Sequence, residues 1–195
     1  MLVLMVLPLA VGTAIVGLRR GGSRGFVLPG LRHVWLIWVA AMLQFVRYTD
    51  PGWAAPLLKS RSGLWPVVVM FALACTFVAI NVAVLPGSAR PGLVIFGVGF
   101  TLNSVTMALN GGMPFSVAAA RASGLPKTVN VPAGPGHVPL TSHTNLPFFA
   151  DILPVPIFQR VVSVGDLLIL LGATWLVVAL IGAARTVLPR TATHT

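Results

Sequence analysis

The chain has 195 residues, of which 56% are hydrophobic and only 8% are charged. Soluble domains carry about a quarter charged residues, so this composition excludes an ordinary water-soluble domain and predicts a protein embedded in a bilayer. The formal net charge of +10 comes from basic residues that flank apolar runs and form no stripe with aromatic residues. Such residues set orientation and contact anionic lipids, so we expect membrane lipids as partners and no nucleic acid.

Five apolar runs are long enough to cross a bilayer as α-helices. They occupy residues 1–18, 33–48, 64–85, 93–110 and 161–184. A secretory signal would carry its positive charge before the first run, but here the arginines follow it, so we expect a retained span. Because backbone groups in lipid must be hydrogen-bonded internally, the predicted fold class is all-α. We expect an integral membrane protein with a five-helix transmembrane bundle, a single membrane domain over residues 1–195, without internal repeats or heptads.

The distribution of Lys and Arg predicts an orientation. Four arginines in the first loop, Arg90 in the third loop and two arginines in the tail fall on one side of the predicted bundle. Short loops rich in Lys and Arg stay in the cytoplasm. We therefore expect a multi-pass protein of the bacterial inner (plasma) membrane, with its N-terminus outside and its C-terminus in the cytoplasm.

Residues 111–160 form a long loop, predicted to be extracytoplasmic, that is rich in Pro, Gly, Ser and Thr. Proline removes backbone donors and breaks long helices, so we expect an extended cover over the outer helix ends, with short helices but no sheet. Gly111 suits the left-handed position that ends a helix, and Pro114 suits the first turn of a new one. Residues 114–124 are expected to lie in the membrane interface, with a re-entrant segment as the alternative.

Polar residues recur at similar depth near the outer ends of three predicted helices. Asn103 and Asn110 share one face of the fourth helix, Gln44 and Arg47 share one face of the second, and Asp166 enters from the outer end of the fifth. A carboxylate in hydrocarbon costs several kcal/mol unless it is paired or hydrated. We expect Asp166 to meet Arg47, or Asn103 and Asn110, in a polar cluster. The alternative, which is the commoner use of such residues, is hydrogen bonding that only holds the helices together.

The loop adds His143, His137 and Asp151 to the candidate functional residues. Imidazole and carboxylate are metal ligands, but their spacing here matches no established ligand pattern. We therefore predict no metal site, and no cofactor either. Cys75 lies inside an apolar run and is expected to be a small buried hydrophobic residue.

Three stretches, NSVTMALNGGMP, the loop H…TNLPFFADILPVP and SVGDLLILLGA, resemble a bacterial membrane family catalogued only as a domain of unknown function. The resemblance covers nearly the whole chain. Its most specific positions are Asn110 to Pro114, Asp151, Ser163, Gly165 and Asp166. It implies a small multi-pass inner-membrane protein, and it implies no activity.

Three classes of function stay open. A non-catalytic accessory, assembly or envelope component comes first, because the chain is small and has few ionisable groups; its partner would be another membrane protein. The alternative is a membrane-embedded enzyme acting on a lipid or isoprenoid at the outer face, with Asp151, Asp166, His137 and His143 as its acid–base groups. A transporter or channel comes third, because the sequence has no inverted repeat.

Overall fold

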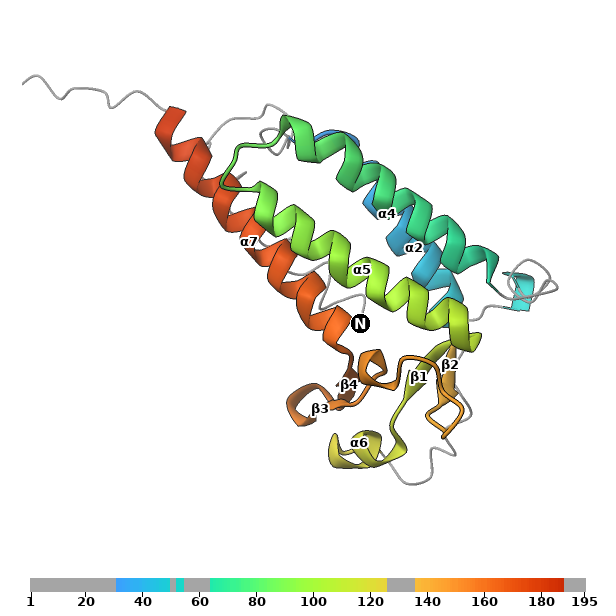
Figure 1. Ribbon diagram of the computed structural model, residues 1–195. Coiled ribbons are helices and arrows are strands. Elements are labelled where there is room, and N and C mark those ends of the chain that lie inside the picture. The colour runs from blue at the N-terminus through green and yellow to red at the C-terminus, as the bar shows by residue number, and fades with distance from the viewer. Residues whose placement is uncertain (1–30, 50–51, 55–63, 126–135, 188–195) are drawn as a thin grey trace, which may run out of the picture.

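The computed structural model describes residues 31–49, 52–54, 64–125 and 136–187. This part of the chain is mostly helical (Figure 1). Its five α-helices are α2 (Trp35–Thr49), α4 (Trp65–Val84), α5 (Arg90–Asn110), α6 (Val117–Ala122) and α7 (Val164–Val187). By length and composition, α4 and α5 could each cross a membrane. The span expected over residues 1–18 lies outside the described residues.

The four longer helices pack in chain order, with α2 against α4, α4 against α5, and α5 against α7 (Figure 1). Successive helices run in opposite directions, with a short turn between α4 and α5 and a long segment between α5 and α7 (Figure 1). The larger buried apolar cluster draws on all four helices. Its members include Leu36, Phe77, Leu93, Leu176 and Leu180. A smaller cluster of Ala40, Val67 and Met70 joins α2 to α4.

Local chemistry explains where these helices begin and end. Helix α5 begins at Arg90, ahead of the apolar run, because Pro91 fits the first helical turn. It ends at Asn110, and Gly111 has a φ of 71°, which confirms the left-handed position predicted for this glycine. Helix α7 begins at Val164, later than the apolar run, because the residues before Ser163 form a strand.

Residues 111–125 and 136–163 form what we call the cap, at the end of the bundle where α5 ends and α7 begins (Figure 1). Its strands and 3-10 turns are β1 (Met113–Phe115), β2 (His137–Pro139), η2 (Pro147–Phe149), β3 (Leu153–Val155), η3 (Pro156–Phe158) and β4 (Arg160–Val162). β1 and β2 pair in parallel, whereas β3 and β4 pair antiparallel. The expectation of a cover without sheet is therefore wrong. Each strand has only three residues, so the few backbone donors of a proline-rich segment are sufficient.

Helix α6 begins at Val117, so the prediction that Pro114 lies in the first turn of this helix is wrong, because Pro114 is the middle residue of β1. Ser116 caps the helix, since its Oγ accepts a hydrogen bond from Ala119 N at 3.2 Å. Phe115, Ala119 and Ala120 are buried, and α6 lies on the side of the cap that faces away from the bundle (Figure 1). Within residues 114–124, Phe115, Ala119 and Ala120 therefore pack inside the cap, whereas Val117 is exposed. Contact of this segment with the membrane interface stays a prediction.

Candidate functional site

Asp166 lies in the first turn of α7, within the sequence Ser-Val-Gly-Asp. Ser163 N donates to Asp166 Oδ2 at 3.0 Å, and Asp166 N donates to Ser163 Oγ at 3.0 Å. This reciprocal pair is a capping box, in which two side chains satisfy backbone donors that the helix leaves free. The carboxylate also lies at the positive end of the helix dipole. The sequence Ser-Val-Gly-Asp thus explains why an aspartate is tolerated in this buried position.

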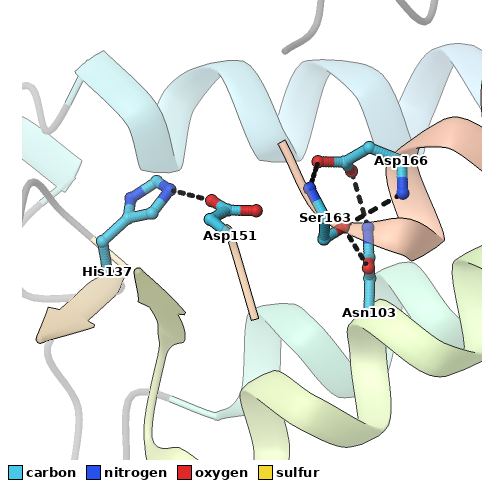
Figure 2. Close-up of polar contacts among 5 residues, drawn as sticks. All are labelled: Asn103, His137, Asp151, Ser163 and Asp166. Atoms are coloured by element: carbon cyan, nitrogen blue, oxygen red, sulfur yellow. Dashed lines mark hydrogen bonds and ion pairs between the residues drawn. The ribbon is translucent and has the colours of Figure 1, made fainter. Parts of the chain in front are cut away.

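Asn103 on α5 completes the network across the helix pair. Its Nδ2 donates to Asp166 Oδ1 at 2.7 Å, and Ser163 Oγ donates to its Oδ1 at 2.9 Å (Figure 2). Each oxygen of the Asp166 carboxylate therefore accepts a hydrogen bond, although the residue is only 7% exposed. A buried polar group is costly only when it lacks partners, and this one has them.

Helices α5 and α7 approach closely enough to make these contacts because glycines lie between them. A Cβ on Gly165 would collide with the Asn103 side chain, and a Cβ on Gly99 would lie 2.8 Å from Ile169 N. Side chains at these positions would push the helices apart and separate Asn103 from Asp166. Small residues have this role in many membrane helix pairs.

The same close approach recurs one heptad further from the cap. A Cβ on Gly92 would lie 2.7 Å from Leu176 N, and a Cβ on Gly172 would collide with the backbone of Phe96. We call Gly92, Gly99, Gly165 and Gly172 the glycine seam. The glycines are seven residues apart on each helix, which places both glycines of a helix on the same helical face.

Asp151 is the second buried carboxylate and lies in the cap. It is 2% exposed, and its Oδ2 lies 3.5 Å from His137 Nε2. Its backbone joins the segment before β3 to β1, since Asp151 N donates to Pro114 O at 2.8 Å and Ser116 N donates to Asp151 O at 2.9 Å. Its Oδ1 is buried without a hydrogen-bond partner among the described residues. Asp151 is thus only half satisfied.

Burial raises the pKa of Asp151 above its usual 3.8, while the hydrogen bond and charge of His137 act in the opposite direction. The charge of Asp151 also acts on Asp166. Figure 2 shows Asp151 between His137 on one side and the network of Asn103, Ser163 and Asp166 on the other. These five residues form what we call the polar layer, at the junction of bundle and cap.

Arg47 and Gln44 come from α2. Arg47 is 7% exposed, and its Nη1 is buried without a hydrogen-bond partner in the described part of the chain, as is Gln44 Oε1. The guanidinium lies against Gly136, where a Cβ would be 2.8 Å from Arg47 Cζ. Between the described residues no contact joins Arg47 to Asp166, because Ser163 and Asn103 already occupy that carboxylate.

The other candidate residues lie elsewhere. Asn110 binds Asn145, with Asn145 N donating to Asn110 Oδ1 at 2.8 Å, so it ties the end of α5 to the cap instead of reaching Asp166. His143 is exposed in a turn apart from the His137–Asp151 pair. Within the described ranges, no three His, Cys, Asp or Glu residues are placed to hold a metal ion. Cys75 is exposed on α4, so the expectation that it is buried is wrong.

Sequence reasoning also missed Asn81, which is fully buried on α4. Arg32 N donates to Asn81 Oδ1 at 2.7 Å, and Asn81 Nδ2 donates to Arg32 O at 3.0 Å. This residue therefore fixes the chain just before α2 onto α4. The available signal was a single asparagine inside an apolar run, which is costly in that setting unless it has partners.

Residues 30–178 match the profile of a family described as "Family of unknown function (DUF5317)". No curated protein and no solved structure matches the chain. The matched segment includes the polar layer, the glycine seam and the whole cap, and it covers well over half of the chain. The chain therefore belongs to this family of unknown function, which confirms the resemblance inferred from its sequence.

Proposed function

We propose that the chain is a multi-pass protein of the bacterial inner membrane, crossed by α2, α4, α5, α7 and the run at residues 1–18. The outward faces of the helices support this proposal. Trp38 is 53% exposed, Met42 62% and Val178 63%, and only 28% of the apolar window of α4 or α5 is buried. A core helix of a soluble protein would be mostly buried, and so much exposed apolar surface would be unfavourable in water.

In this proposal the cap lies outside the cytoplasm. The arginine-rich loop after residue 18, Arg90 and the basic tail then share the cytoplasmic side, as the charge rule for short loops requires.

Cysteine labelling in a Cys75→Ala background tests both statements. Thr141→Cys places a thiol in the cap, and Ser88→Cys places one in the turn between α4 and α5; both native residues are exposed. We expect a membrane-impermeant maleimide to label position 141 in intact spheroplasts and position 88 only after permeabilisation. The reverse pattern would contradict the orientation, and labelling of both positions in intact spheroplasts would contradict the crossing of the membrane by α5.

We further propose a non-catalytic role, as an accessory, assembly or envelope component. The observation that carries it is the closed network around Asp166. A carboxylate that transfers protons needs a free oxygen facing its substrate, whereas both oxygens of Asp166 accept hydrogen bonds from Asn103 and Ser163. The buried polar residue of α7 is thus used to hold helices and cap together.

Purification of the full-length chain from native membranes tests this role. We expect a second membrane protein at a fixed stoichiometry, measured by native mass spectrometry after extraction in a mild detergent. An unrelated multi-pass protein carrying the same affinity tag is the control. A chain that purifies alone, in detergent and again in native nanodiscs, would contradict the accessory role.

One observation favours a second candidate, a membrane enzyme acting on a lipid or isoprenoid. His137 has a side chain 31% exposed and faces a buried carboxylate, Asp151, which is how an aspartate orients a general base. His137→Asn would then change the lipid profile of cells, while the matched variant His143→Asn, on an exposed turn of the same cap, would not. Equal profiles for both variants and the wild type would remove the enzyme hypothesis.

A further inference from the structure

β3 and β4 form a hairpin whose tip is apolar and exposed. Ile157 is 89% exposed and Phe158 is 56% exposed. At the base of the tip, Val155 pairs with Arg160, and Gln159 closes the turn with a φ of 49°. The turn is therefore tightly closed, and its two largest apolar side chains point away from the protein. In water such side chains would be left without apolar contacts.

The hairpin is attached directly to α7. β4 leads through Val162, which is 5% exposed, and the fully buried Ser163 into the first helical turn. Three extended residues span about 10 Å, so the tip lies about that far from the start of α7. The headgroup region on each side of the hydrocarbon core is about 5 to 8 Å thick. A hairpin that runs sideways from the helix end would therefore hold its tip at membrane level.

Figure 1 shows that the hairpin does extend to the side of α7, away from α5. Helix α7 also has exposed apolar residues, which are Leu167, Leu171, Trp175 and Val178, between 46% and 63% exposed. The helical spacing of Leu167, Leu171 and Val178 places them on a face turned away from the glycine face that contacts α5. The tip thus extends the exposed apolar surface of α7 beyond its first turn.

We propose that this hairpin tip is a membrane anchor of the cap. Ile157 and Phe158 insert into the interfacial region of the bilayer beside α7, with the exposed Arg160 at the level of the phosphates. Charge agrees with a lipid occupant, because no acidic residue lies between Asp151 and Asp166 and anionic headgroups attract arginine. The inference depends on the proposed membrane location, and it deepens that proposal by assigning a lipid contact to the cap.

Anchoring has a consequence for the cap as a whole. β3 and β4 both contact α6, and Asp151 joins the segment before β3 to β1. A tip held in the headgroups therefore fixes the entire cap relative to the membrane plane. A protein partner seated on the tip is the competing explanation, and the experiment below separates the two.

Spin labelling of the full chain in vesicles of phosphatidylethanolamine and phosphatidylglycerol tests the anchor. Single cysteines are introduced in a Cys75→Ala background as Ile157→Cys, Leu171→Cys and His143→Cys. Leu171 is the reference for the bilayer and His143, exposed in the cap, is the reference for water. The measurement is the accessibility of each label to oxygen, which concentrates in lipid, and to a nickel chelate, which stays in water.

We expect the ratio of oxygen to nickel accessibility at position 157 to be severalfold higher than at position 143 and lower than at position 171. A label at 157 as accessible to nickel as the one at 143, with 171 in the bilayer, would overturn the anchor and leave the membrane location intact. A label at 157 shielded from both reagents would indicate a protein partner and also overturn it. A water-exposed label at 171 would overturn the membrane location and the anchor together.

Discussion

The α5–α7 interface and the cap each bury one aspartate, but the two carboxylates differ in their hydrogen-bond partners. Asp166 lies between α5 and α7 with donors on both carboxylate oxygens. Asp151 lies in the cap with His137 on one oxygen and no described partner on the other. A fully satisfied polar network stabilises the packing around it, whereas a half-satisfied one keeps a desolvation cost. The network around Asp166 therefore stabilises the packing of α5 on α7. In the cap, burial and His137 together set the pKa of Asp151.

The largest loss of stability is expected from a substitution in the glycine seam. In Gly172→Ala the new Cβ meets the backbones of Phe96 and Gly92, which cannot rotate away. Overpacking costs about 1–3 kcal/mol, and an obstacle made of backbone puts this variant at or above the upper value. The measurement is the melting temperature in detergent.

Gly87→Ala is the matched control, because a Cβ at Gly87 meets nothing within 4 Å. It should melt near the wild-type temperature. Equal melting temperatures for the two variants would show that α5 and α7 do not approach as closely as described.

Removal of the Asp166 carboxylate is expected to cause the next largest loss of stability. Asp166→Ala leaves the Asn103 amide and Ser163 N as buried donors without partners. Each such donor costs about 1–3 kcal/mol, but removing the buried carboxylate also removes its own desolvation cost, so we expect a net loss of about 2 kcal/mol in thermal or denaturant unfolding. Asp166→Asn keeps one acceptor oxygen of similar shape and should lose less. An alanine variant as stable as the wild type would show that the network does not hold the seam.

The buried Asp151 in the cap is expected to make the stability of the protein depend on pH. Burial raises the pKa of Asp151 in the folded state above its usual 3.8, so the folded state binds this proton more tightly than the unfolded state does. Its contribution to stability therefore grows as pH falls through the raised pKa towards 3.8, and it is lost as pH rises through the same window. We expect Asp151→Asn to remove this contribution from the curve of melting temperature against pH.

His137→Gln is the control for that experiment, since it removes the partner but keeps the carboxyl group. Without His137 the pKa of Asp151 should rise further, because His137 acts against burial. The pH dependence of stability in this variant should therefore extend to higher pH. Curves with identical slopes in the wild type, Asp151→Asn and His137→Gln would assign the pH dependence to other groups.

The smallest effect is expected at Arg47. Its guanidinium is buried against Gly136 and has no carboxylate partner among the described residues. Replacing a buried charge by an apolar side chain of similar length is often neutral or stabilising, so Arg47→Met should change stability by less than about 1 kcal/mol. Arg47→Ala, which leaves a void, should melt lower. A loss in Arg47→Met as large as in Asp166→Ala would show that the charge itself is needed.

Several local features could be predicted from the sequence because neighbouring residues decide them. Gly111 ends α5 in the left-handed conformation, which glycine adopts without a steric penalty. A short helix was also expected soon after Gly111 and is present, although it starts after the Ser116 cap and not at Pro114. The polar residues near the helix ends were recognised as a group, because charge and amide are expensive among apolar side chains.

The sequence could not decide between the alternative partners that we named for Asp166, which were Arg47 or Asn103 with Asn110. Asn103 and Asp166 are 63 residues apart, and their contact requires α5 to pack on α7 through glycines. The pairing of His137 with Asp151 likewise requires β1 and β2 to align in parallel. Arg47 was an equally reasonable partner for Asp166 on charge alone. The spacing of polar residues along one helix shows that they share a face, but it does not show which other helix packs against that face.

The sequence by itself determined the apolar runs and the end of α5 at Gly111, because these depend on composition and on steric preferences within a few residues. The tertiary structure alone decided which aspartate is fully satisfied and which is not. That outcome depends on how closely two helices approach and how a proline-rich cap folds over them. Both depend on the sum of many weak, long-range contacts, and no local stretch of sequence carries that sum.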